Sequence, residues 1–233
     1  MSIIHRFENF PIIKLVKQKW HLRTEARAHQ RSQRRWRSDE IAPHLTWDRM
    51  MTGDSLWNLY QGHHDFQVRD RILEVGPGYG RLFRTALQRK ISFGSYTAVE
   101  LSQARVDRLA AEFPLESVLF VQGDIENWSN ERFFNVVLCS STFEHLYPDC
   151  RRALQNIHRQ LSSDAAVFID FIYSTESLRY FEADETYIRM YSHDELIAIF
   201  NACGYAIATI EECILGEGNY GPVKRYVVVA TPI

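Results

Sequence analysis

One stretch of the chain, residues 72–82, constrains the fold more than any other. It reads ILEVGPGYGRL, an apolar run that contains a carboxylate and leads through three alternating glycines into an amphipathic segment. Glycine lets the backbone turn sharply and lets a ligand lie against the main chain at a helix N-terminus. The stretch therefore predicts a buried strand, a binding turn and a helix. A tight turn that binds nothing is the simple alternative.

From residue 71 onward, short apolar β-branched runs alternate with amphipathic stretches. This alternation predicts an α/β fold, a doubly wound parallel sheet with helices on both faces. The expected strands are Arg71–Val75, Tyr96–Glu100, Ser117–Val121, Phe134–Cys139 and Ala165–Ile172. The expected helices between them are Arg81–Lys90, Gln103–Phe113 and Asp149–Leu161. Their connections are short, as compact βαβ units require.

The C-terminal part of the chain departs from this alternation. Residues 192–195, Ser-His-Asp-Glu, form a capping box, so we expect a helix that begins there and ends at Gly204. Two strands follow, Tyr205–Cys213 and Val223–Thr231, and the linker 216–222 is too short for a crossover helix. The last two strands should therefore pair antiparallel. The result is a seven-stranded, mostly parallel sheet with a reversed C-terminal strand at or near an edge.

Two acidic residues follow the second and third predicted strands. Glu100 ends its strand, where a carboxylate can accept both hydroxyls of a ribose, and Asp124 comes directly after the next strand. Because parallel strands gather their carboxyl ends at one edge, we expect the glycine turn, Glu100 and Asp124 to converge. Each acid taken alone could be a surface carboxylate. The three features in this order favour a nucleotide-like ligand.

With these motifs, the chain resembles the class I S-adenosylmethionine-dependent methyltransferases over about residues 54–231. Residues 74–80 look like the family's glycine motif, residues 134–146 like its fourth strand and the following loop, and residues 225–230 like its reversed terminal strand. NAD-dependent dehydrogenases use a related turn, and a dehydrogenase is the less favoured alternative. In a dehydrogenase a second half-domain would be expected for the nicotinamide, whereas this sheet ends in a hairpin.

The resemblance implies how the cofactor S-adenosyl-L-methionine, with its product S-adenosyl-L-homocysteine, would be held. The motif's acid lies near the methionine amino group, the glycines cradle the cofactor, Glu100 binds the ribose and Asp124 contacts the adenine. The residues so implied are Glu74, Gly76, Pro77, Gly78, Gly80, Glu100, Leu101, Asp124, Ile125, Ser140 and Ser141. Asn135 stands where the family often has Asp, which we expect to loosen a strand entrance. Asp164-Ala165 replace a frequent glycine pair.

Methyl transfer from a sulfonium is an in-line displacement, which mainly requires that the nucleophile be held against the methyl group. A neutral amine or a phenol must also lose a proton, and a histidine can accept it near neutral pH. His145, with Glu144 beside it, follows the fourth strand and is the candidate base; organising the loop is its alternative role. Residues 140–143 read SSTF, unlike the Pro-Pro-aromatic motif of planar-nitrogen methylases. We therefore expect an O, N or C nucleophile of a small organic metabolite.

Segments 1–70 and 173–191 precede or interrupt the sheet and are rich in aromatic residues, so we expect them to cap the acceptor. An apolar pocket that accommodates a ring would suit such a cap. The candidate pocket residues are Trp57, Tyr60, Tyr173, Tyr187 and Tyr191. Each of them taken alone could equally belong to the packing of the core.

Charge is distributed unevenly along the chain. Residues 1–37 carry ten Lys or Arg against two acids, whereas the remainder carries 17 against 27, so a segment of +8 precedes one of −10. We divide the chain into a basic helical extension or substrate cap, 1–53, and a cofactor-binding domain, 54–233. The basic segment could pack on its own domain, as the helical spacing of Ile12, Val16 and Trp20 suggests. It could also dock on RNA or on a membrane-associated lipid or quinone, or form a dimer arm.

The rest of the composition points to a cytoplasmic globular protein of unknown oligomeric state. With 45% hydrophobic and 24% charged residues, the chain can bury a core without disulfides or metal. The four cysteines are far apart, and no apolar run approaches the roughly 18 residues of a membrane span. Metal sites of the catechol type need clustered acids at strand ends, and Asp170 is the only nearby candidate after the fifth strand, so we expect no metal.

Overall fold

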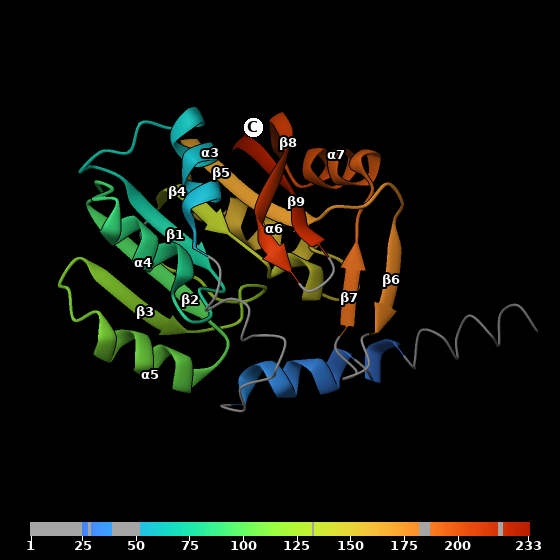
Figure 1. Cartoon of the computed structure of the whole chain (residues 1–233), viewed down its shortest axis with the longest axis horizontal. Coiled ribbons are helices and arrows are strands. Elements are labelled where there is room, and N and C mark those ends of the chain that lie inside the picture. Colours follow the sequence, from blue (N-terminus) through green and yellow to red (C-terminus); the bar gives the residue numbers. More distant parts are fainter. Residues whose placement is uncertain (1–24, 28, 39–51, 132, 182–186, 219–220) are drawn as a thin grey trace, which may run out of the picture.

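The computed structural model describes residues 25–27, 29–38, 52–131, 133–181, 187–218 and 221–233. It shows a twisted sheet with helices on both faces and a two-stranded hairpin at one side (Figure 1). The strands are β1 (Arg71–Val75), β2 (Ser95–Glu100), β3 (Val118–Gln122), β4 (Phe134–Cys139), β5 (Leu161–Ile172), β6 (Leu178–Phe181), β7 (Tyr187–Met190), β8 (Tyr205–Gly218) and β9 (Gly221–Pro232). The helices are α3 (Asp54–His63), α4 (Arg81–Gln88), α5 (Gln103–Glu112), the 3-10 turn η3 (Phe143–His145), α6 (Arg151–His158) and α7 (His193–Ala202).

The main sheet has seven strands in the order β3-β2-β1-β4-β5-β9-β8. Strands β1 to β5 run parallel, and β9 runs antiparallel to both β5 and β8. This confirms the predicted fold, with β9 as the reversed strand next to the edge. The carboxyl ends of β1, β2 and β4 meet at one rim, with Val75 paired to both Val99 and Cys139.

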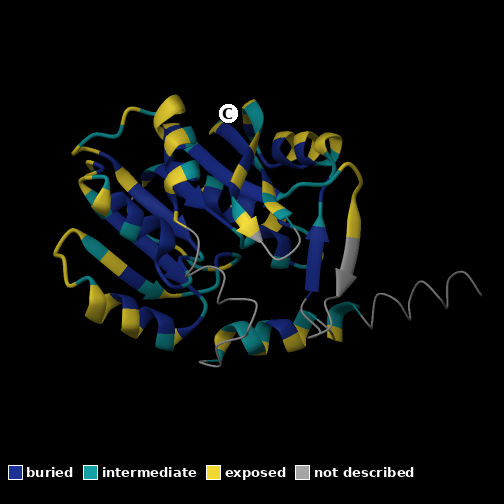
Figure 2. Cartoon of the chain, viewed as in Figure 1, coloured by how far each residue is buried: buried dark blue, intermediate teal, exposed yellow. Residues whose placement is uncertain are grey.

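Two hydrophobic cores lie on the two faces of this sheet. Side chains of α3, α4 and α5 form one core with the sheet, and side chains of α6 and α7 form the other. The central strands are buried on both faces, as Figure 2 shows, which is why they appear in the sequence as continuous apolar runs. Helix α7 begins as its capping box predicts, because the Ser192 hydroxyl accepts the Glu195 N–H at 3.3 Å.

The predicted elements match the observed ones with two corrections. Helix α6 ends at His158 and β5 already begins at Leu161, so the predicted helix Asp149–Leu161 was too long. The predicted loop 216–222 is mostly strand, because β8 continues to Gly218 and β9 begins at Gly221. The entrance of β4 is irregular at Asn135, as expected, because its pairing with β5 shifts register between Phe134 and Val136. The Asn135 amide nevertheless accepts the Arg71 N–H at 2.7 Å and donates to Asp70 at 2.8 Å, which joins β4 to β1.

One further element was not expected. The hairpin β6–β7 occupies part of the segment 173–191, which we expected to cap the acceptor, and it forms a separate antiparallel sheet. A helix over residues 25–27 and 29–37, blue in Figure 1, lies within the segment predicted to be a basic helical extension; it is found below the carboxyl ends of the strands, between α5 and this hairpin. The predicted helical positions Ile12, Val16 and Trp20 lie outside the described residues.

Candidate functional site

The glycine turn between β1 and α4 uses the left-handed backbone region three times. The φ angles are 66° at Gly76, 58° at Gly78 and 79° at Gly80, a region that favours glycine. A Cβ atom on Gly76 would lie 2.2 Å from Thr142 Oγ1, and one on Gly80 would lie 2.7 Å from Leu109 Cδ2. Two of the three glycines are therefore required by the protein's own packing as well as by the turn.

Glu100 lies directly beside this turn. Its Oε2 accepts the Gly78 N–H at 3.1 Å, and its Oε1 accepts the Ser102 N–H at 3.0 Å and Arg105 Nη1 at 3.3 Å. Burial raises the pKa of the Glu100 carboxyl group, and Arg105 and the backbone donors offset only part of that effect. The expected convergence of Glu100 with the glycine turn is what the structure shows.

Asp124 stands one strand further along the rim. The Gly123 N–H donates to the Glu100 carbonyl at 2.9 Å, which ties the two strand ends together. The Asp124 carboxylate accepts the Glu126 N–H at 3.1 Å and lies 3.6 Å from the guanidinium of Arg37. Arg37 belongs to the helix over residues 25–27 and 29–37, hereafter the N-terminal helix. Leu101 is partly exposed beside Glu100, and Ile125 is buried in the core behind the Asp124 turn.

Glu74, the acid of the glycine motif, points to the face of the sheet that α3 and α4 cover. It is 2% exposed, and the hydroxyl of Tyr96 donates to its Oε2 at 2.7 Å. Pro77 is buried in the turn, and its carbonyl accepts the Gly80 N–H at 2.8 Å. Glu74 is thus held by the sheet itself.

A buried network of charges lies behind the end of β4. Ser140 donates to Asp170 and accepts from Arg81 at 2.7 Å, and the Ser141 N–H donates to Asp170 at 2.9 Å. That hydrogen bond holds Ser141 in a left-handed conformation, φ 56°, which is uncommon outside glycine. Both predicted serines therefore belong to a network centred on Asp170.

Arg225 of β9 completes this network. It donates to Asp170 at 2.6 and 2.9 Å and to Glu144 at 2.8 Å, and all three side chains are almost fully buried. Burial works against the charge of Arg225, but the two carboxylates outweigh it and raise the pKa of the guanidinium. Sequence reasoning missed Arg225, although a charged residue followed by the apolar run Tyr226–Ala230 is a signal that could have singled it out.

His145 lies on the opposite side of the same loop from the buried Glu144. Its Nδ1 is 3.0 Å from the carbonyl oxygen of Tyr187 in β7. The ring of Trp36, in the N-terminal helix, packs on it with 4.6 Å between ring centroids. Glu144 and His145 therefore have different surroundings, a buried ion pair for the first and a half-buried aromatic site at the rim for the second.

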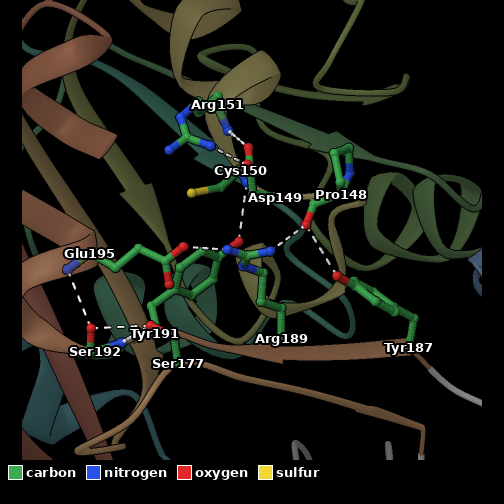
Figure 3. Close-up of polar contacts among 10 residues, drawn as sticks. All are labelled: Pro148, Asp149, Cys150, Arg151, Ser177, Tyr187, Arg189, Tyr191, Ser192 and Glu195. Carbon is green, nitrogen blue, oxygen red and sulfur yellow. Dashed lines mark hydrogen bonds and ion pairs between the residues drawn. The ribbon is translucent and has the colours of Figure 1, made fainter. Parts of the chain in front are cut away.

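The predicted pocket residues lie in two separate places. Trp57 and Tyr60 of α3 are fully buried against the sheet, where Trp57 donates to the Leu82 carbonyl at 2.9 Å. Tyr187 and Tyr191 are fully buried around the hairpin, where their hydroxyls contact Pro148 and Cys150 (Figure 3).

Tyr173, the remaining predicted pocket residue, is partly exposed and packs on Tyr226, with 4.7 Å between the ring centroids. The five residues therefore do not come together around one cavity. A role of any of them in the acceptor pocket stays a prediction.

The helix over residues 25–27 and 29–37 covers this rim through contacts with several elements. Ser32 accepts the Tyr187 N–H at 2.7 Å, and the ring of His29 stacks on Tyr147 at 5.2 Å. Burial lowers the pKa of His29, which Asp124 partly offsets. The described part of the basic segment thus packs on its own domain. In the described ranges, no helix is long and apolar enough to cross a membrane.

Comparison with known proteins places the fold and the family. Residues 62–210 match the sequence model of a family described as methyltransferase domain. The Bacillus subtilis (strain 168) protein YrhH, named as a methyltransferase, is 30% identical over 129 residues, which cover 54% of this chain and 68% of YrhH. A malonyl-[acyl-carrier protein] O-methyltransferase of Priestia megaterium is 28% identical over 96 residues, 41% of this chain, and the match spans only 34% of that protein.

Solved structures share the fold at low sequence identity. The glycopeptide N-methyltransferase MtfA, complexed with S-adenosyl-L-homocysteine, superposes with a TM-score of 0.63 at 18% identity, covering 78% of this chain and 90% of MtfA. A 1,6-didemethyltoxoflavin-N1-methyltransferase of Burkholderia thailandensis superposes with a TM-score of 0.59 at 20% identity, covering 84% of this chain and 92% of that enzyme.

Proposed function

Because the chain belongs to the family of methyltransferase domains, we propose that it transfers a methyl group from S-adenosyl-L-methionine to an O, N or C nucleophile of a small organic molecule. The observation that carries the proposal is the contact of Glu100 with the glycine turn, 3.1 Å from carboxylate to Gly78 N–H. It puts a buried acceptor of hydroxyl groups at the helix N-terminus, where a nucleotide-like ligand binds.

The residues at this rim suit such a cofactor chemically. A carboxylate oxygen has two lone pairs, and Glu100 Oε2 accepts the Gly78 N–H with one of them, so a ribose hydroxyl can use the other. Glu74 offers a second buried carboxylate, suited to an ammonium group, and Asp124 offers a partly exposed one beyond Glu100. We propose that Glu74 holds the methionine part of the cofactor, Glu100 the ribose and Asp124 the adenine. When bound, the cofactor supplies an electrophilic methyl group on a sulfonium.

His145 is the residue that we propose as proton acceptor. A carbonyl oxygen can only accept, so the 3.0 Å contact with Tyr187 places the proton of a neutral His145 on Nδ1. Nε2 then carries the lone pair and can take a proton from an amine or a hydroxyl group of the acceptor. Glu144, in contrast, is committed to Arg225 and holds the loop in place.

The rings at the rim and the similar proteins support a small organic acceptor. Trp36 and His145 pack on each other, and His29 stacks on Tyr147, so aromatic side chains gather where we propose that the acceptor binds. Aromatic faces of this kind suit a small organic ring. The similar proteins are named as a malonyl-[acyl-carrier protein] O-methyltransferase, a glycopeptide N-methyltransferase and a 1,6-didemethyltoxoflavin-N1-methyltransferase. The acceptor atom stays open among these.

Calorimetric titration with S-adenosyl-L-methionine tests the cofactor assignment. We expect wild type to bind, and Glu100→Gln to bind about 10- to 100-fold more weakly, because a hydrogen bond to a charged group contributes about 1.5–3 kcal/mol. Glu116→Gln, an exposed acid beyond α5, is the matched control and should bind like wild type. Equal affinity of Glu100→Gln and wild type, or no binding by either, would refute the assignment. NADH should not bind.

A further inference from the structure

The hydrogen bond of His145 depends on a backbone atom that another part of the chain holds. Tyr187 begins β7, and its carbonyl oxygen is the partner of His145 Nδ1 at 3.0 Å. The N–H of the same residue donates to the hydroxyl of Ser32 at 2.7 Å. Ser32 lies in the N-terminal helix and is 2% exposed. Two hydrogen bonds, one to the N–H and one to the carbonyl of Tyr187, therefore connect this helix to the imidazole of His145.

The rest of β7 is fixed from the side of the main domain, as Figure 3 shows. The hydroxyl of Tyr187 and the guanidinium of Arg189 both donate to the carbonyl of Pro148, at 3.1 and 2.9 Å. Arg189 also pairs with Glu195 of α7. The strand is thus anchored by its side chains, but the Tyr187 N–H is satisfied from the N-terminal helix. Of the residues in this frame, only Ser32 lies outside residues 62–210, the part of the chain that matches the family model.

The same helix contacts the imidazole ring directly. The ring centroids of Trp36 and His145 are 4.6 Å apart, with 46° between the ring planes. The guanidinium of Arg105 lies 5.8 Å from the Trp36 ring and pairs with Glu100. Trp36 therefore packs between the candidate base and the partner of the candidate ribose acid. Its ring limits how far the imidazole can rotate away from the Tyr187 carbonyl.

We infer that Ser32 and Trp36 are positioning residues of the methyl-transfer site, which hold His145 with its proton on Nδ1 and its Nε2 lone pair available to the acceptor. This inference rests on the proposed function, in which His145 takes the proton. It assigns the N-terminal helix a part in the chemistry besides covering the rim. Neither residue touches a reacting atom in this scheme, because Ser32 acts through Tyr187 and Trp36 acts through the ring of His145.

Nitrogen NMR of the full-length chain labelled with ¹⁵N-histidine tests the inference without an acceptor. Long-range ¹⁵N–¹H spectra at about pH 8, where an ordinary imidazole is neutral, report which ring nitrogen carries the proton. The His145→Gln variant assigns the signal. We expect Nδ1–H at His145 in wild type. In Ser32→Ala the ratio of Nδ1–H to Nε2–H should fall about fivefold, the change expected from one ordinary hydrogen bond.

Three further variants distinguish a specific effect on the position of His145 from a general loosening of the N-terminal helix. Ser32→Thr keeps the hydroxyl and should restore the wild-type ratio. Trp36→Leu should lower the ratio as Ser32→Ala does, and it provides the test if Ser32→Ala does not fold. Arg34→Ala shortens an exposed side chain on the same helix and should leave the ratio unchanged.

Two results would overturn the inference: a proton on Nε2 in wild type, or an unchanged ratio in both Ser32→Ala and Trp36→Leu. Calorimetry with S-adenosyl-L-methionine on the same samples distinguishes a failure of the positioning role from a failure of the proposed function. Cofactor binding with an unchanged ratio would refute the positioning role alone. Failure of wild type to bind the cofactor would refute the proposed function, whatever the spectra show.

Discussion

The Gly76→Ala substitution tests how tightly the glycine turn is built into the fold. Gly76 has φ 66°, and a residue with a Cβ atom loses about 1–2 kcal/mol in this region. The added Cβ would also lie 2.2 Å from Thr142 Oγ1 and 2.9 Å from its Cγ2, and such overpacking costs about 1–3 kcal/mol. We therefore expect a loss of about 2–5 kcal/mol in the free energy of unfolding, as the sum of these two independent costs.

Urea unfolding of a double-mutant cycle separates the two costs. Thr142→Ala removes Oγ1 and Cγ2 and leaves Cβ at 3.1 Å, so in the double variant about 1–3 kcal/mol should be recovered while the backbone cost remains. Gly62→Ala is the control, because its Cβ would meet nothing within 4 Å and alanine favours a helix by up to about 1 kcal/mol. A loss below about 1 kcal/mol for Gly76→Ala, or no recovery in the double variant, would refute the reasoning.

Two further predictions concern charged groups of the rim. Burial raises the pKa of Glu100, and ribose hydroxyls bind its ionised form, so affinity for S-adenosyl-L-methionine should fall as the pH drops through that raised pKa. Calorimetry across acidic pH checks this, and Glu100→Gln should flatten the profile; a flat wild-type profile would contradict it. Arg225→Met leaves Asp170 and Glu144 buried without their cation, so urea unfolding should show a loss of about 3–5 kcal/mol. A loss below about 1 kcal/mol would show that the two acids find other partners.

Local pattern was enough to predict the sheet, because each central strand is buried on both faces and so is mostly apolar. The prediction for β1, Arg71–Val75, matched residue for residue for this reason. Strand β7 could not be found in the same way. Its four residues include Arg189, which is buried only because Pro148 and Glu195 come from other elements to meet it. The polarity pattern of a short segment cannot predict that a charged residue is buried when the partners of that charge come from other elements.

The contacts of the candidate site also differ in how far they could be predicted from the sequence. Glu100 and Gly78 were expected to meet, since the topology of a parallel sheet alone brings consecutive strand ends together. Arg225 meets Glu144 across 81 residues of sequence, and Ser32 meets Tyr187 across 155. Nothing in the residues near either partner specifies such a pairing. Sequence reasoning therefore predicted that Glu100 meets the glycine turn, and it missed the frame that surrounds the candidate base.

The net charge of the buried side chains at the rim connects these separate contacts to cofactor binding. Among the described residues around the glycine turn and the end of β4, four acids and three arginines lie almost fully buried, which leaves one negative charge in excess: Glu74, Glu100, Glu144 and Asp170 against Arg81, Arg105 and Arg225. Arg189 of β7 is also buried, and its charge is paired with Glu195 of α7. A buried excess charge is costly unless a partner compensates it. The proposed cofactor carries a sulfonium, an ammonium and a carboxylate, hence one net positive charge, and would supply that compensation. The protein would then be more stable with the cofactor than without it, since a ligand that binds only the folded state stabilises that state.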